Sequence, residues 1–177
     1  MRTLGEIMFA LLCCWYTATR PVEDRVVMLA ETYVGHQETA HNRSEHIDYW
    51  LTRIGVPVGN NYCAAFVAMV LDSVEVDYPK VRSAVAQNYI TSNSIRATRV
   101  MQGHPVRRGA VAVWKRGDTW MGHVGFVTDW SGPTGETIEA NTTPQGPSEG
   151  RGNGVYEKQR QIVPTAYFRI THFTEVW

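Results

Sequence analysis

The chemistry that this sequence could perform centres on Cys63, which heads an apolar run with helical spacing. A thiol in the first turn of a helix lies near the positive end of the helix dipole and near backbone N–H groups that have no helical partner. Both favour the thiolate, which is the form that attacks a carbonyl carbon. Asn60 or Asn61 is expected to cap this helix. The alternative is that Cys63 is a small buried apolar residue, the common fate of a free cysteine.

A histidine and two polar residues downstream complete the set that cysteine acyl transfer requires. His123 follows Gly122 at the start of a β-type run, and Glu139 and Asn141 alternate with apolar residues in the next one. Alternation places Glu139 and Asn141 on one face of a strand, from which either could hold the imidazole of His123. The pattern predicts a thiolate nucleophile, a histidine that transfers the proton, and a polar side chain that orients the ring. Both Glu139 and Asn141 are candidates for that last role.

The elements that must position these residues are helices first and strands afterwards. Helical patterns cover residues 21–33, 44–54, 61–71 and 81–89. Residues 95–101 fit a helix and a strand equally well. Strand patterns separated by turns cover residues 109–114, 122–128, 136–141, 155–158 and 166–173. This order predicts one α+β domain over residues 21–177, in which the N-terminal helices pack on a C-terminal antiparallel sheet.

Composition agrees with one folded domain. Of the 177 residues, 44% are hydrophobic and 19% are charged, as in ordinary globular proteins. The 17 Lys and Arg residues balance the 17 Asp and Glu residues. A net charge of zero argues against nucleic acid as the main partner, because phosphate binding requires a surplus of basic residues.

The first twenty residues have the parts of an export signal. Residues 1–20 combine a basic start, an apolar run and small residues near a cleavage position, and the run is too short to span a bilayer as a helix. Lipid modification at Cys13, which would give a membrane anchor, is a second interpretation, and an apolar N-terminal helix is a third. We expect an exported protein of the cell envelope, periplasmic or secreted. If Cys13 and Cys14 are removed with this segment, Cys63 remains as a lone thiol.

Five short segments together resemble a known protein family, and they follow one another in the same order as in that family. They are residues 61–67, 109–114, 122–127, 137–142, and 154–156 with Arg160. Residues 33–38 lie upstream of these five segments and are part of the same resemblance. In these segments the sequence resembles the CHAP domains, the cysteine- and histidine-dependent amidohydrolases and peptidases of peptidoglycan hydrolases and phage lysins. The resemblance extends from about Glu23 to Phe173 and implies a papain-like α+β fold.

The resemblance also implies roles and a substrate. Cys63 would be the nucleophile and His123 the general base and acid, with Glu139 and Asn141 orienting the histidine and completing the site. The substrate would be an amide bond of peptidoglycan, either between muramic acid and L-alanine or within the stem or cross-bridge peptides. Tyr62 stands where the family often has tryptophan, so we expect it to contact substrate beside the nucleophile. No cofactor is implied.

Metal sites are not expected. Residues 56–61 contain no carboxylate, so we predict no calcium site of the kind that some lysins carry before the cysteine. His36, His41 and His46 recur every five residues, which does not suit one helical face, and no thiol or paired carboxylate accompanies them.

The aromatic residues near His123 and the polar residues after Gly35 also lead to predictions. Trp114 is expected in the core, whereas Trp120 and Trp130 lie beside turns and could line a groove; we predict that Trp120 contacts substrate. Gln37 and Glu38 are interpreted as part of a plain polar loop rather than as a brace for the cysteine helix.

Two other functions fit the same residues. One is the same hydrolysis carried out by an injected antibacterial effector or a phage component. The other is an inactive module that binds the cell wall or a partner protein. The joint presence of Cys63, His123, Glu139 and Asn141 argues against the inactive module, because a binding scaffold has no need of all four.

Overall fold

The computed structural model describes residues 20–76, 78–145 and 152–177, and in them most helices precede the sheet. The helices are α2 (Val22–Glu31), α3 (Glu45–Arg53), α4 (Cys63–Ser73), the 3-10 helix η1 (Ala86–Tyr89) and α5 (Ala97–Met101). The strands are β1 (Ile95–Arg96), β2 (Val111–Arg116), β3 (Gly122–Ser131), β4 (Thr134–Thr142), β5 (Gly154–Gln161) and β6 (Phe168–Thr174). The predicted signal or lipoprotein segment, residues 1–20, lies outside the described residues except for Arg20. None of the described helices is both long enough and apolar enough to cross a membrane.

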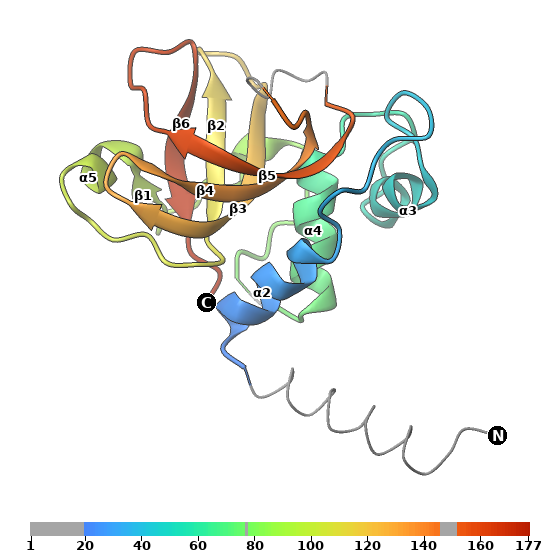
Figure 1. Ribbon diagram of the computed structural model, residues 1–177, viewed down its shortest axis with the longest axis horizontal. Helices are drawn as coiled ribbons and strands as arrows, with labels where there is room; N and C mark the ends of the chain where they lie inside the picture. The colour runs from blue at the N-terminus through green and yellow to red at the C-terminus, as the bar shows by residue number, and fades with distance from the viewer. Residues whose placement is uncertain (1–19, 77, 146–151) are drawn as a thin grey trace.

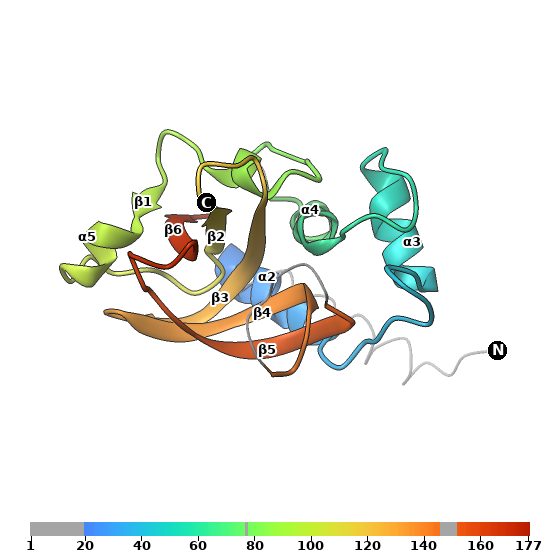
Figure 2. The ribbon, with the colours of Figure 1, turned by 90° about the horizontal axis from the view of Figure 1, so that it is seen from above.

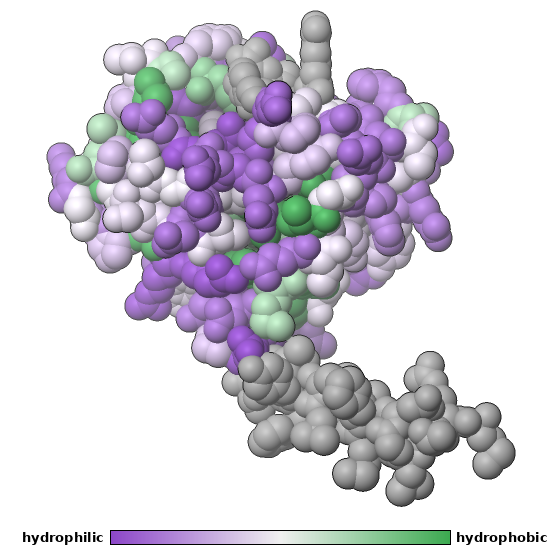
Figure 3. All heavy atoms as spheres, viewed as in Figure 1, coloured by the Kyte–Doolittle hydropathy of each residue, from purple (hydrophilic) through white to green (hydrophobic). Residues whose placement is uncertain are grey.

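The strands form one antiparallel sheet in the order β1-β6-β2-β3-β4-β5. Figures 1 and 2 show the curved sheet on one side of the molecule, with α4 between the sheet and α3. Helix α4 contacts β3 and β4 on one side and α3 on the other. Over β4 and β5, the surface in Figure 3 is mostly hydrophilic. This arrangement confirms the predicted α+β class and agrees with a papain-like fold.

The core lies on both faces of the sheet. Residues Val113, Phe126 and Ile138 face the helices, where α4 is buried from Cys63 through Leu71. On the opposite face a smaller cluster contains Trp114 and Trp130, which are 4% and 8% exposed. The prediction that Trp114 is a core residue is therefore confirmed. Trp130 packs edge-on against Phe173 in the same cluster.

Some helices and strands begin or end at other residues than the sequence pattern predicts. At these ends, contacts with other parts of the chain fix the boundary. Strand β2 begins at Val111 rather than at 109, because Gly109 adopts φ +81° and a Cβ there would lie 2.9 Å from the backbone of Glu23 in α2. The predicted helix over 81–89 shortens to η1. Ser83 accepts hydrogen bonds from the backbone of Val85 and the side chain of Asn88, which hold the chain outside a helix. Residues 95–101, which fitted both patterns, contain β1 and then α5.

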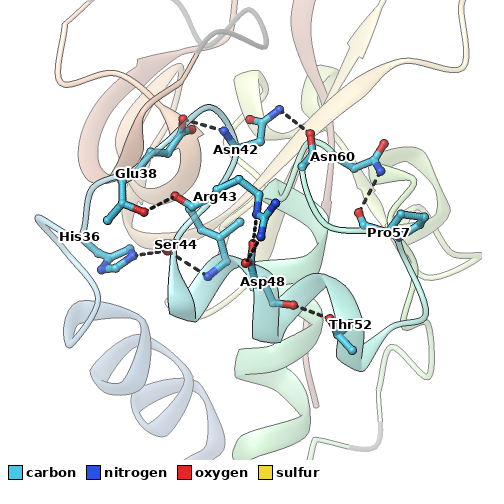
Figure 4. Close-up of polar contacts among 12 residues, drawn as sticks. His36, Glu38, Asn42, Arg43, Ser44, Asp48, Thr52, Pro57 and Asn60 are labelled. Atoms are coloured by element: carbon cyan, nitrogen blue, oxygen red, sulfur yellow. Dashed lines mark hydrogen bonds and ion pairs between the residues drawn. The ribbon is translucent and has the colours of Figure 1, made fainter.

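The loop between α2 and α3 is an ordered brace, contrary to our interpretation of Gln37 and Glu38. Its backbone pairs with residues 153–155 at the start of β5, including an isolated bridge between Gln37 and Gly154. Glu38 accepts hydrogen bonds from the Tyr62 hydroxyl at 3.0 Å and from the Asn42 backbone at 2.8 Å. Figure 4 shows how the polar side chains of this loop and of α3 point toward one another.

Two further contacts fix the loop to α3 and to the turn before α4. Ser44 accepts a hydrogen bond from the backbone N–H of Ile47 at 3.1 Å and thereby caps α3. The side-chain amide of Asn42 donates to the Gly59 carbonyl at 3.1 Å. The segment that leads into Cys63 is therefore held by a side chain 17 residues upstream of its partner.

Candidate active site

Cys63 is the first residue of α4, as the periodicity predicts, but the predicted caps are wrong. Tyr62 occupies the cap position and makes no side-chain cap hydrogen bond. The Asn60 side chain bonds to the Pro57 carbonyl, and that of Asn61 bonds to Asn141. The first intrahelical bond runs from Phe66 N–H to the Tyr62 carbonyl at 2.9 Å. The N–H groups of the first turn therefore precede the helical ladder and face the thiol region.

His123 is the second residue of β3, and the sheet register places it opposite Trp114 in β2. The two rings meet edge to face with centroids 5.3 Å apart. His123 is only 4% exposed and Cys63 only 7%. The imidazole hydrogen-bonds the Cys63 thiol and, through Nε2, the Glu139 carboxylate. Because Nε2 bonds to Glu139, Nδ1 is the ring nitrogen that remains for the bond to Cys63.

Of the two candidates for orienting the ring, Glu139 is the one that bonds to it in the structure. Its Oε2 lies 2.8 Å from His123 Nε2, and the carboxylate has no solvent exposure. Arg160 in β5 donates two hydrogen bonds to the same carboxylate, from Nε at 2.6 Å and from Nη2 at 2.5 Å. The Thr137 hydroxyl donates to Oε1 at 2.6 Å. Gly125 makes room for this side chain, since a Cβ there would lie 2.5 Å from Glu139 Cγ.

The charges of the three groups are coupled. Burial would raise the pKa of Glu139, but hydrogen bonds from Arg160 and His123 outweigh it and hold the pKa well below the ordinary value. Burial likewise would lower the pKa of His123, yet the bonds to Cys63 and Glu139 raise it to about 9. For Cys63, burial opposes ionisation, and the hydrogen bond and charge of His123 lower the pKa in spite of it. These directions favour a thiolate–imidazolium pair at neutral pH.

The Asn141 side chain bonds to another residue than the histidine. A bulge between Ala140 and Thr142 interrupts the pairing with β5, and Asn141 itself has φ +57°. The bulge breaks the alternation on which the prediction of a shared face with Glu139 depended. The Asn141 side-chain amide donates to Asn61 at 3.1 Å, while its buried Oδ1 has no hydrogen-bond partner. Asn141 therefore bonds to the segment just before α4, whereas Glu139 bonds to the His123 ring.

A groove of about 220 Å³ opens onto the thiol. It is bordered by Cys63, His123, Asn61 and Asn141, and by Arg116 and Trp120 from the hairpin between β2 and β3. Trp120 is 73% exposed, in keeping with the predicted contact to substrate, which stays a prediction. Tyr62, in contrast, is fully buried and outside the groove, because its ring packs near Trp50 and its hydroxyl bonds to Glu38. The expected substrate contact of Tyr62 is therefore corrected to a structural one.

Arg160, Thr137 and Gly125 are site residues whose roles the sequence pattern did not give. Arg160 appeared only as part of the last family-like segment, and its role depends on β5 pairing with β4 so that Arg160 lies opposite Gly135. Thr137 precedes Glu139 by two residues, and that spacing on one strand face is the signal that could have identified it.

Two of the three histidines before α4, His36 and His46, lie in an aromatic cluster. His36 and His46 lie with ring centroids 4.8 Å apart, and His36 Nε2 hydrogen-bonds the Ser44 hydroxyl at 2.8 Å. Within the described ranges no group of three or more His, Cys, Asp or Glu side chains is placed to hold a metal ion.

Comparison with known families adds one finding. The family model described as CHAP domain matches residues 54–141, a segment that contains Cys63, His123, Glu139 and Asn141. Neither the curated proteins nor the solved structures give a match to this chain.

Proposed function

This chain belongs to the CHAP domain family, and on that premise we propose that it is a cysteine-dependent hydrolase of peptidoglycan amide bonds. In the proposal Cys63 and His123 are the catalytic residues and Glu139 is the positioning residue. The family supports peptidoglycan hydrolysis in general. The observation that supports this division of roles is the buried series of hydrogen bonds from Cys63 through His123 to Glu139.

The first half of the reaction forms an acyl-enzyme. The Cys63 thiolate attacks the amide carbonyl carbon, and the carbonyl π electrons move to oxygen. The Cys63 N–H, which precedes the helical ladder of α4, is a donor available to that oxyanion. As the tetrahedral intermediate collapses, the C–N bond breaks and the nitrogen takes the proton of the His123 imidazolium. The amine leaves, and the acyl group remains on sulfur as a thioester.

The second half returns the enzyme to its starting state. Neutral His123 accepts a proton from water as the water oxygen attacks the thioester carbonyl. Collapse of this intermediate breaks the C–S bond, which releases the carboxylic acid product and leaves the thiolate paired with the imidazolium. Throughout, Glu139 keeps the ring oriented with Nδ1 toward sulfur, and Arg160 keeps the carboxylate ionised.

The test is release of new amines from purified peptidoglycan by the full-length protein. We expect release by the parent and none by Cys63→Ala. A Cys13→Ala, Cys14→Ala variant is the matched control, since it removes the other two thiols and should keep full activity. Mass analysis of the fragments then identifies the bond, distinguishing an N-acetylmuramoyl-L-alanine amidase from an endopeptidase. A folded parent that releases no amine, and whose thiol alkylates no faster than free cysteine, would favour the inactive binding module instead.

We propose further that the protein works outside the cytoplasm, because its substrate lies there and residues 1–20 have the parts of an export signal. Fractionation of cells that express the full chain, compared with a variant lacking residues 2–20, tests this. Equal distribution of both proteins in the cytoplasm would contradict it.

A further inference from the structure

The hairpin between β2 and β3 forms one wall of the groove and brings Arg116 to it. Arg116 is the last residue of β2, two positions after Trp114, which lies opposite His123. Because side chains two apart share a strand face, Arg116 is on the same side of the sheet as His123, one step nearer the hairpin turn. It is partly exposed and borders the same groove as Cys63.

The positive charge of Arg116 is not neutralised in the described part of the protein. No ion pair there involves Arg116, whereas Arg160 on the other side of His123 is occupied by Glu139. Among the residues that the structure describes, no Asp or Glu borders the groove. Apart from the Cys63–His123 pair, which has no net charge when ionised, Arg116 is the charged side chain that a substrate meets along the described groove lining.

The hairpin is fastened in place, so Arg116 is presented from a fixed backbone. The side-chain amide of Gln87 in η1 donates to the Thr119 carbonyl at 2.6 Å and to the Met121 carbonyl at 2.8 Å. Within the hairpin, the Arg116 N–H bonds to the Met121 carbonyl at 3.1 Å, and the Thr119 hydroxyl donates to the Arg116 carbonyl at 2.6 Å. Binding energy from a fixed donor is not reduced by the cost of ordering the loop.

We propose that Arg116 binds a free carboxylate of the peptide substrate close to the scissile amide, and so selects substrates in which that carboxylate is not amidated. The inference rests on the proposed function. Guanidinium binds carboxylate through two parallel hydrogen bonds, and an unpaired arginine in a groove without acids has this ligand as its natural partner. Stem peptides offer such a group, since their glutamate carries a free or an amidated α-carboxylate beside the amide bonds of the chain.

The first experiment compares hydrolysis of two synthetic stem peptides that differ only in whether the glutamate α-carboxylate is free or amidated. We expect the parent to prefer the free acid about ten- to a hundredfold in kcat/KM, the range of a hydrogen bond to a charged group. Arg116→Gln should remove this preference by slowing the free acid alone, and Arg116→Lys should keep part of it. Lys115→Gln is the matched control, because Lys115 adjoins Arg116 in sequence but does not border the groove.

The second experiment separates this inference from the proposed function. Binding of the same two peptides is measured with Cys63→Ala, and with Cys63→Ala combined with Arg116→Gln, so that no hydrolysis is needed. Tighter binding of the free acid that depends on Arg116 supports the carboxylate site even if the parent proves to cleave neither peptide. Equal binding of both peptides to Cys63→Ala, or an equal loss of binding for both peptides on adding Arg116→Gln, overturns the carboxylate site. The hydrolase proposal still stands in that case if the parent cleaves the peptides.

Discussion

The charge state of Cys63 should depend on a carboxylate that it does not touch. Replacing Glu139 with glutamine keeps the size of the side chain but removes the charge that His123 and Arg160 share. The imidazolium then loses its buried counter-charge, and the thiolate loses part of the positive charge that stabilises it. We therefore expect the variant to contain much less thiolate at neutral pH than the parent.

The magnitude follows from the histidine. A rise in the pKa of His123 from 6.5 to about 9 corresponds to about 3 kcal/mol in favour of the imidazolium, supplied by Cys63 and Glu139 against the cost of burial. Burial is unchanged in Glu139→Gln, so loss of one adjacent opposite charge should lower the pKa of His123 by about one to three pH units. The pKa of Cys63 moves the opposite way, because its partner carries less charge. At pH 7 the thiolate fraction should fall about tenfold or more.

The assay is the rate of alkylation by iodoacetamide as a function of pH, in a Cys13→Ala, Cys14→Ala background where Cys63 is the one remaining thiol. The midpoint of the rise should lie below pH 9.0, the ordinary pKa of the thiol, in the parent, and Glu139→Gln should shift it to higher pH. Glu136→Gln, an exposed position on the same strand, should match the parent. The profile of Glu139→Asp, which keeps the charge, should lie between those of the parent and Glu139→Gln. This variant replaces Glu139→Gln in the test if Glu139→Gln folds poorly. Profiles of the parent and a folded Glu139→Gln that coincide below pH 8 would refute the reasoning.

Two further predictions concern the surroundings of Glu139. Gly125→Ala places a Cβ 2.5 Å from Glu139 Cγ and 2.8 Å from the Ile138 carbonyl, so we expect a loss of about 1–3 kcal/mol in the free energy of unfolding and a slower alkylation of Cys63 at pH 7. Gly132→Ala has open space around its Cβ but a φ of +58° that costs stability in alanine, so it is the comparison for the alkylation rate alone, and equal rates in the two variants would contradict the prediction. Because the folded pKa of Glu139 is depressed, its contribution to stability is present above the unfolded value of 4.5 and is lost as the pH falls below it. Denaturant unfolding between pH 6 and pH 3 should therefore decline less steeply in Glu139→Gln than in the parent, and parallel declines would argue against a depressed pKa.

Local sequence pattern was sufficient for the elements that carry Cys63 and His123. The apolar spacing after residue 61 is a property of consecutive residues, and so is the Ser44 cap, so neither needs knowledge of the fold. Strand ends were less predictable because they depend on a partner strand. For example, β3 and β4 continue to Ser131 and Thr134 because each completes the pairing of the other through a short turn.

The choice between Glu139 and Asn141 could not be made from alternation. A period of two assumes a regular strand, and the bulge at Asn141, with its positive φ, is set by close packing of the chain around Gly152. A Cβ at Gly152 would lie 1.9 Å from the backbone of Asn141. Likewise the bond between Tyr62 and Glu38 joins residues far apart in sequence, so a buried tyrosine and a substrate-binding one have the same pattern.

The location of Cys63 at the start of α4 accounts for only a small part of the lowering of its pKa. A helix dipole contributes about 0.3–1 kcal/mol to a neighbouring charge. The hydrogen bond and charge of His123 lower the pKa of Cys63 more than the backbone groups of Val124 and Ala64 do. Those contributions from His123 depend in turn on Glu139 in β4 and on Arg160 in β5. A cysteine at the start of a helix therefore identifies where a nucleophile can lie, whereas its ionisation is produced by three further strands and depends on the register that brings them together.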